Sequence, residues 1–409
     1  MDKRDFEFDL FDPQQTQNMW DKMQRMRSEC PVAQPSEGFY YTSRYADTQR
    51  VFRDSRTFSC QGGFRAAGVE IPEDELFLAE MDAPLHPRLR KLLLKSFNPG
   101  MAKSAETFTQ TYIKQLLDDL KAKGGGDIVG EVSARVPLAV TGHVLGIPLE
   151  DIAELSAQFF ALLHTDWPAY GVKNREHPDA GKDIAGSAPE LAAYFDKMID
   201  ARRSGAVKTG DLVSQMVEAD IEGDKLSTER IRSLAINFLS AGLSTTNLIS
   251  NLYYRLITSD DFDRTLRDDA AVIPVAVEES LRFEPPVLFL FRTATQDTEI
   301  ADTSIKPGDR LVTGIASANR DETVFDRANE FRLNASDPEN LAFGAGPHLC
   351  LGNHMARMEG RVAVEEFFRH FGPGELRLDP GYEYHLMPHF LEYGPERLDV
   401  VVHAGANSR

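Results

Sequence analysis

The clearest hydrophobic pattern in the chain begins near Ser227. Apolar residues then follow the i, i+3, i+4, i+7, i+8 spacing of an amphipathic helix, at Ile231, Leu234, Ala235, Phe238 and Leu239. The apolar character continues on other faces through Leu256, which predicts a long helix that runs through the interior. Small and hydroxyl-bearing residues from Gly242 to Thr246 interrupt this helix midway. They could admit a ligand close to the helix or loosen its hydrogen-bond ladder.

Shorter patterns predict the other elements. Near the N-terminus, Gly38–Ser43 reads as a strand and Tyr45–Arg53 as a helix, and Glu106–Ala122 reads as a helix that stops at a glycine run. The stretches from Asp297 to Ala318 and from Glu375 to His403 favour strands. No linker or repeat divides the chain, so we expect a mainly α fold with a smaller β portion, in a single domain over residues 1–409.

Composition narrows the class of protein. The net charge of −19 argues against non-specific binding to nucleic acid or to an anionic membrane. The three cysteines are far apart in sequence, which excludes a CxxC motif and fits a reducing compartment. The charged N-terminus lacks the apolar region of a signal peptide, and no apolar run is long enough for a transmembrane helix. We therefore expect a cytoplasmic protein without nucleic-acid or membrane partners.

Candidate chemistry centres on Cys350. Two glycines precede this cysteine, a third follows two residues later, and apolar residues then repeat at helical spacing as far as Phe371. Glycine permits a close approach of the backbone to a flat ligand. A cysteine at the N-terminal end of a helix favours the thiolate, which is the form that binds iron as a soft ligand. A buried free cysteine in a glycine-rich turn is the alternative interpretation.

The segment from Phe343 to Gly352 resembles the haem-binding signature of the cytochrome P450 family, F-G-x-G-x-H-x-C-x-G. All six fixed positions match, at Phe343, Gly344, Gly346, His348, Cys350 and Gly352. The resemblance implies a cytochrome P450-like fold in which haem b lies between the proximal helix after Cys350 and the long distal helix. It makes Cys350 the iron ligand, and it places Phe343 and Gly344 against the cofactor.

Further motifs extend the resemblance from His86 onward. Glu279 and Arg282 match the E-x-x-R pair that locks the haem-proximal core of the family, although spacing alone would also fit an exposed ion pair. The resemblance also supplies four candidate contacts to the haem propionates, namely His86, Arg90, Arg292 and His348. An arginine fork suits a carboxylate, and His86 and Arg90 lie one helical turn apart.

The interruption of the long helix resembles the family's oxygen-activation motif, A-G-x-D/E-T-T/S. Thr245 matches the threonine, whereas Ser244 stands where the family carries an acid. Serine can hold a water molecule but does not readily supply a proton at neutral pH. Protons could pass through Ser244, waters and a more distant acid, which we favour. The substrate could instead assist its own activation, or the enzyme could use peroxide.

The resemblance implies a monooxygenase that inserts one oxygen atom from O2 into a small to medium apolar organic substrate. Electrons would come from a ferredoxin-type partner and its reductase, since the chain shows no flavin, iron–sulfur or dinucleotide-binding segment. A local basic patch includes Arg88, Lys91 and Lys95 and could dock such an acidic partner, or could simply be solvated.

The sequence gives little information about the identity of the substrate. An apolar pocket is expected from six residues, Phe238, Ala241, Val287, Leu288, Phe289 and Phe390, although strand alternation would bury some of them in the core. By the same resemblance, the loop from Cys60 to Glu80 and the segments from Phe159 to Tyr170 and from Pro388 to Tyr393 are further pocket candidates. The rival functions are a haem-thiolate peroxygenase or other non-monooxygenating haem enzyme, supported by Ser244, and a non-catalytic haem or ligand sensor.

Overall fold

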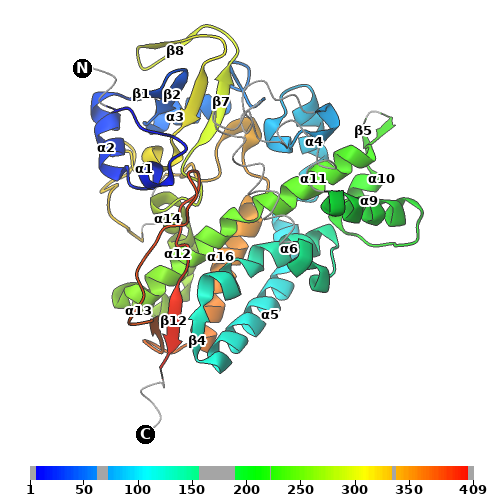
Figure 1. The fold of residues 1–409 in the computed structure, drawn as a ribbon, viewed down its shortest axis with the longest axis vertical. Helices are drawn as coiled ribbons and strands as arrows, with labels where there is room; N and C mark the ends of the chain where they lie inside the picture. The colour runs from blue at the N-terminus through cyan, green and yellow to red at the C-terminus, as the bar shows by residue number, and fades with distance from the viewer. Residues whose placement is uncertain (1–5, 62–71, 156–188, 222, 334–337, 404–409) are drawn as a thin grey trace. The chain divides into compact units, whose positions relative to one another are not determined.

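The computed structural model describes residues 6–61, 72–155, 189–221, 223–333 and 338–403 (Figure 1). Two compact units alternate along the sequence. The first comprises Met1–Phe58, Pro99–Pro137 and Leu243–Arg409, and the second comprises Ser59–Asn98 and Leu138–Gly242. The single domain expected from the sequence stays a prediction. The pocket candidate from Phe159 to Tyr170, and the loop candidate between residues 62 and 71, lie outside the described residues.

The first unit contains a five-stranded sheet in the order β1-β2-β10-β7-β3. Its strands are β1 (Val32–Ser36), β2 (Phe39–Thr42), β3 (Phe58–Ser59), β7 (Leu290–Ala294) and β10 (Arg310–Thr313). β10 runs parallel to β2, with Val312 opposite Tyr41, and antiparallel to β7, with Leu311 opposite Arg292. This register fixes the direction in which Arg292 leaves the sheet.

The remaining elements of the first unit are mostly helical. The helices are α1 (Pro13–Gln17), α2 (Trp20–Glu29), α3 (Tyr45–Arg53), α5 (Pro99–Lys123), η4 (Val129–Ser133), α12 (Ser244–Thr258), α13 (Asp260–Asp268), η8 (Ala270–Val272), α14 (Ile273–Phe283), α15 (Ile315–Ala318), η9 (Gly346–His348) and α16 (Asn353–His370). The short strands are β4 (Gly125–Asp127), β8 (Thr298–Ile300), β9 (Thr303–Ile305), β11 (Leu376–Leu378) and β12 (Asp399–Val402).

Helix α16 packs against α5, α12 and α14, and Figure 1 shows it running beside α12. Gly360 permits the close approach, because a Cβ atom there would lie 3.2 Å from Leu248 Cδ2 on α12 and 3.4 Å from Val277 Cγ1 on α14. Burying a side chain such as Leu248, which is 1 % exposed, contributes about 1.5–3 kcal/mol. The helix that follows Cys350 is therefore rooted in the core of this unit.

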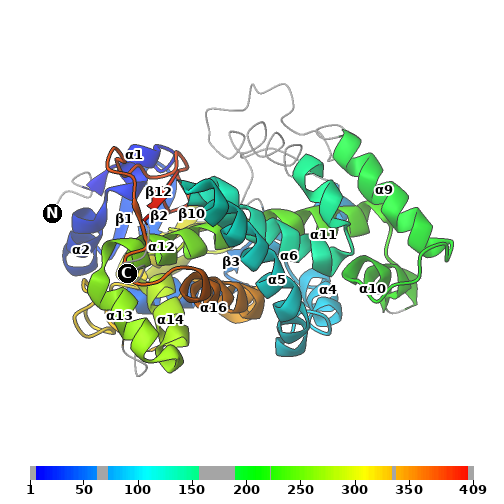
Figure 2. The same cartoon turned by 90° about the horizontal axis from the view of Figure 1, so that it is seen from below.

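In its described residues, the second unit is helical apart from one two-stranded ribbon. Its elements are η2 (Glu73–Glu75), η3 (Leu78–Glu80), α4 (Leu85–Leu93), η5 (Leu149–Asp151), α9 (Pro189–Arg203), α10 (Leu212–Glu218), β5 (Asp220–Ile221), β6 (Asp224–Lys225) and α11 (Thr228–Ala241). α6 (Arg135–Leu145) crosses the boundary between the units along the chain. α9, α10 and α11 pack together (Figure 2), and Arg232 of α11 pairs with Asp196 at 2.8 Å and Glu75 at 2.9 Å.

Most of the expected elements are confirmed. The long helix appears as α11 and α12, separated only by Gly242 and Leu243. Ser227 caps α11, because its hydroxyl accepts a hydrogen bond from Arg230 N at 3.0 Å. The strand expected as far as Ala318 is wrong at its end, where Ile315–Ala318 form α15. All four of these residues are buried, and a short buried run has no periodicity that separates helix from strand.

Candidate functional site

The loop before Cys350 has a backbone that only glycine adopts easily. Gly344 and Gly346 have φ angles of +70° and +72°, in the left-handed region. Cys350 N donates a hydrogen bond to Phe343 O at 2.9 Å, which closes the loop around the short helix η9. The two glycines therefore let the chain fold back, so that Cys350 emerges immediately before α16.

Gly346 also permits a contact with α3. A Cβ atom at this position would lie 2.8 Å from Arg53 Cα and 3.0 Å from Phe52 O, and backbone atoms cannot move aside as a flexible side chain could. Gly344 lies against the same helix, where a Cβ atom would be 3.9 Å from Phe52 Cε1. The cysteine loop is thus seated on the C-terminal turn of α3.

We expect Gly346→Ala to lower the free energy of unfolding by about 1–3 kcal/mol more than Gly308→Ala does. Both glycines have positive φ angles, so both alanines carry a left-handed backbone penalty of about 1–2 kcal/mol, but no atom lies within 4 Å of a Cβ at Gly308. Urea unfolding of the two variants measures the difference. Equal losses would contradict the close approach of the loop to α3.

Cys350 precedes the first turn of α16. Asn353 Nδ2 donates a hydrogen bond to Cys350 O at 2.6 Å, and a Cβ atom at Gly352 would lie 3.8 Å from Cys350 Sγ. None of Cys30, Cys60 and Cys350 is in a disulfide. The N-terminal end of an 18-residue helix favours negative charge, so this position suits a thiolate ligand.

Arg292 supplies an unmatched positive charge in the same unit. It is only 4 % exposed, its guanidinium donates to Phe291 O at 2.7 Å, and no carboxylate in the described part of the chain pairs with it. Its Cζ lies 5.3 Å from the centre of the Phe52 ring, against which the cysteine loop also packs. A buried charge without a counter-ion is costly, so the side chain fits an anionic group of a bound cofactor such as a haem propionate.

The other propionate candidates come from two elements. His348 is the last residue of η9 and is partly exposed. His86, which is buried, and Arg90, which is partly exposed, lie one turn apart on α4 of the second unit. Their contacts with a propionate stay a prediction.

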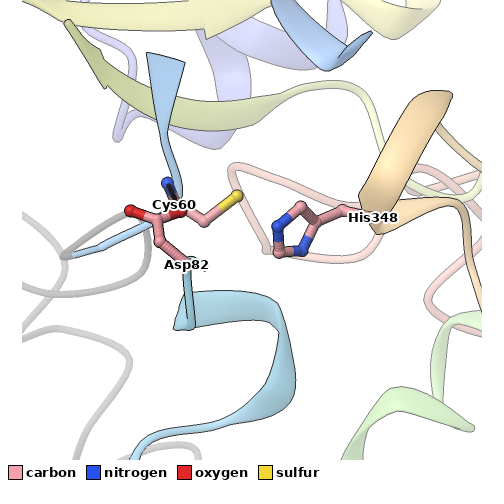
Figure 3. A group of neighbouring side chains, drawn as sticks. All are labelled: Cys60, Asp82 and His348. Atoms are coloured by element: carbon pink, nitrogen blue, oxygen red, sulfur yellow. Dashed lines mark hydrogen bonds between the residues drawn. The ribbon is translucent and has the colours of Figure 1, made fainter. Parts of the chain in front are cut away.

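Asp82 holds the start of α4 in place. Cys60 N donates to Asp82 Oδ1 at 3.1 Å, Ser59 Oγ donates to the same carboxylate, and His86 N donates to Asp82 O at 2.9 Å. Figure 3 draws Cys60 and Asp82 of this unit, together with His348 of the first unit. The carboxylate ties the end of β3 to α4 and so fixes the turn that carries His86.

The interruption of the long helix lies at Gly242 and Leu243, and Ser244 and Thr245 begin α12. Thr245 is 9 % exposed, and Ser244 is partly exposed. Ser244 Oγ donates to Glu392 Oε1 at 3.1 Å, and Asn247 Nδ2 donates to Glu392 Oε2 at 2.9 Å. The motif pattern did not single out Glu392. The sequence did carry one signal: Asn247 lies in the helix predicted to run through the interior, and a buried side-chain amide requires a hydrogen-bond partner.

Glu279 and Arg282 form a buried pair on α14, with side chains 4 % and 2 % exposed and two N–O distances of 2.7 Å. Arg282 also donates to the carbonyl oxygens of Asn319, Ala328 and Glu330 at 2.8–3.0 Å. The interpretation of this pair as an exposed helical ion pair is therefore wrong. The Glu279–Arg282 pair holds the segment from Asn319 to Glu330, which precedes the cysteine loop, against α14.

The candidate pocket residues divide into two groups. Leu288 and Phe289 are 0 % exposed, and the Phe289 ring lies 5.6 Å from that of Phe291 and 6.3 Å from that of Phe390. Val287 is partly exposed and packs on the cluster that contains Phe52 and Ala345 of the cysteine loop. In the second unit Phe238 is 8 % exposed and packs on Phe97, whereas Ala241 is exposed.

Arg88, Lys91 and Lys95 are all exposed on or directly after α4, and the spacing of Arg88 and Lys91 puts them on one face. Leu94, beside Lys95, is 47 % exposed, which is unusual for a large apolar side chain. No helix in the described part of the chain combines the length and the apolar character needed to cross a bilayer.

Known proteins share both the sequence and the fold. The family model described as Cytochrome P450 matches residues 10–381. A putative cytochrome P450, YjiB of Bacillus subtilis, is 32 % identical over 349 residues, which cover 85 % of each chain. The structure of a mutant of P450 EryK in complex with erythromycin B is 30 % identical, covers 95 % of this chain and 97 % of that chain, and has a TM-score of 0.83.

A further solved structure is that of CYP109E1 from Bacillus megaterium in complex with testosterone. It is 26 % identical, covers 95 % of this chain and 100 % of that chain, and has a TM-score of 0.81. The family match spans most of the chain and agrees with the six matched positions around Cys350 and with the buried Glu279–Arg282 pair. The chain therefore belongs to the cytochrome P450 family, whose members are haem-thiolate monooxygenases.

Proposed function

We propose that this chain holds haem b through the thiolate of Cys350 and inserts one oxygen atom from O2 into a small to medium apolar organic substrate. The observation that carries the proposal is the position of Cys350, between a glycine loop seated on α3 and the N-terminal end of α16. When bound, a thiolate-ligated haem supplies the cleavage of the O–O bond.

Residues of the chain bind the cofactor and assist proton transfer in this proposal. The start of α16 stabilises the Cys350 thiolate. Arg292 neutralises a haem propionate, because no carboxylate among the described residues forms an ion pair with its guanidinium. His348, His86 and Arg90 are further propionate contacts in this proposal. Thr245, at the start of α12, would supply a hydroxyl group for proton transfer in this proposal, and Ser244 precedes it on the same turn.

Apolar substrates are supported by the residues around the site and by the relatives. Val287 contributes an accessible apolar side chain, and Phe390 borders an aromatic cluster with Phe289 and Phe11. Full burial makes Leu288 and Phe289 supporting residues behind the pocket in this proposal. In their respective structures CYP109E1 is in complex with testosterone, and a mutant of P450 EryK is in complex with erythromycin B.

Isotope labelling tests the proposed reaction. The reduced ferredoxin system, ¹⁸O₂ and a panel of apolar compounds chosen by their shift of the haem absorption band should give products with one ¹⁸O atom. Peroxide without reductant should give far less product. Efficient turnover with peroxide alone would favour the peroxygenase, and ligand binding without any product would favour the sensor.

We propose that the ferredoxin-type partner docks near Arg88, Lys91 and Lys95. Lys91→Glu combined with Lys95→Glu should slow reduction by ferredoxin about tenfold or more at low salt, because steering by opposite charges raises association rates. Stopped-flow reduction measures the rate, and Lys306→Glu, an exposed lysine of the first unit, is the matched control. An unchanged rate, or an equal loss in the control, would contradict the docking surface.

A further inference from the structure

A polar strip on α12 faces the C-terminal segment of the chain. Ser244, Asn247 and Asn251 recur at i, i+3 and i+7, so they share one face of α12. The first two donate to the two oxygens of Glu392 at 3.1 and 2.9 Å, and Asn251 Nδ2 donates to Tyr393 O at 3.3 Å. The strip thus holds a carboxyl group beside the position at which the family carries its acid.

The main chain fixes Glu392 in this place. Leu288 N donates to Leu391 O at 2.8 Å, Tyr393 N donates to Pro286 O at 3.1 Å, and Gln17 Nε2 donates to Glu392 O at 3.1 Å. Gly394 admits Asn247, because a Cβ atom there would lie 2.4 Å from Asn247 Oδ1. The carboxyl group is therefore positioned before any ligand binds.

The surroundings of Glu392 favour its protonated form. Burial raises the pKa of this carboxyl, and the hydrogen bonds from Ser244 and Asn247 lower it by less. No cation in the described part of the chain forms an ion pair with it. The charged groups along the adjoining elements are Arg255 and Glu284, which pair with each other at 2.7 Å. Other titratable groups on these and the neighbouring elements include Arg320, which donates to Phe283 O, together with His389 and Tyr393. Glu359 lies on α16, which packs against α12, and burial raises the pKa of its carboxyl.

We infer that Glu392 takes the place of the acid missing at position 244 and supplies protons through the Ser244 hydroxyl to the site beside Thr245. The inference rests on the proposed function. Glu392 acts through Ser244 and is a positioning residue, because no contact of its own with the reacting oxygen is required. Asn247 donates to Oε2 in either protonation state, which leaves Oε1 as the atom that carries the proton.

The proton path balances with the reaction. Insertion of one oxygen atom follows RH + O2 + 2 e⁻ + 2 H⁺ → ROH + H2O, with both electrons from the ferredoxin-type partner. When Glu392 is protonated, the hydrogen bond between Oε1 and Ser244 Oγ reverses, so that Oε1 donates. Oε1 then passes its proton to Ser244 Oγ, and Ser244 passes its own hydroxyl proton onward. The carboxylate then takes a proton from solvent, and the two protons delivered leave in the water molecule.

Glu392→Gln tests the inference, with Glu396→Gln, an exposed glutamate four residues later, as the matched control. General acid–base groups contribute about 10²–10⁴-fold to rate. We therefore expect the yield of product per reductant consumed to fall at least about tenfold in Glu392→Gln, with a matching rise in hydrogen peroxide. The control should be unchanged. Ser244→Ala should show the same loss, and combining it with Glu392→Gln should add little, because both act on one path.

Two further measurements separate a proton path from a structural effect. Infrared pH titration of the resting, substrate-free holoprotein should show a protonated carboxyl band that Glu392→Gln removes and Glu396→Gln retains. Ser244→Asp in the Glu392→Gln background should restore the coupling, because it returns an acid to position 244. If Glu392→Gln fails to fold, Glu392→Asp is used instead and should retain both the band and most of the coupling.

The outcomes distinguish this inference from the proposed function. Unchanged coupling in Glu392→Gln, or a loss that Ser244→Asp does not restore, would overturn the inference alone, provided that the wild-type protein forms labelled product. A wild-type protein that forms no product with reductant and O2 would instead overturn the proposed function.

Discussion

Replacing Glu279 by glutamine should lower the free energy of unfolding by about 3–5 kcal/mol, because it leaves the Arg282 guanidinium buried without its counter-ion. Both side chains are almost inaccessible, and Glu279 also accepts a hydrogen bond from Arg332 N. Natural domains are stable by only about 5–15 kcal/mol, so this loss removes a large share of the total. Urea unfolding, followed by tryptophan fluorescence, measures it.

The matched control for this prediction is Asp261→Asn on α13. Asp261 and Arg264 have the same i, i+3 spacing as Glu279 and Arg282, but both are exposed. Exposed pairs contribute about 0–1 kcal/mol, so the control should stay within that range. A loss of similar size in the two variants would show that burial does not determine the cost of breaking the Glu279–Arg282 pair.

Replacing Cys350 by serine should have the largest effect on activity. A hydroxyl group is a harder and weaker ligand for iron than a thiolate. Residues that only orient a metal ligand contribute about 10–100-fold to affinity or activity, so loss of the ligand itself should lower turnover by more than about 100-fold. Haem content and the rate of product formation measure the effect.

Cys30→Ser is the control for Cys350→Ser. Cys30 follows α2, and its Sγ lies 3.5 Å from Val32 O, in a partly buried place outside the cysteine loop. Haem content and turnover should match those of the wild-type protein. If Cys350→Ser retained both haem and turnover, another residue would hold the iron.

Local sequence signals predicted the elements around the site well. Ser227 marked the start of α11, the small residues from Gly242 marked the break before α12, and the apolar repeat after Cys350 predicted α16. These features depend on neighbours a few residues away, so periodicity and capping chemistry reveal them. The sequence also predicted a conformational role for Gly346, but its close contact with Arg53 and Phe52 is revealed only by the fold.

Contacts between distant segments could not be predicted in the same way. Ser244 and Glu392 are 148 residues apart, and the segment around Glu392 has no motif, so only the fold reveals their hydrogen bond. The burial of Arg292 without a carboxylate depends likewise on the register of β7 against β10. The departure at Ser244 was visible in the sequence, whereas the group that replaces the missing acid was not.

The carbon monoxide spectrum of the reduced protein tests thiolate ligation by Cys350 most directly. If the Cys350 thiolate holds the haem iron, the reduced complex with carbon monoxide should absorb at the long-wavelength position specific to thiolate ligation. Cys30→Ser should retain this band, and Cys350→Ser should lose it. A wild-type spectrum typical of histidine-ligated haem, or a thiolate band that persists in Cys350→Ser, would contradict the assignment.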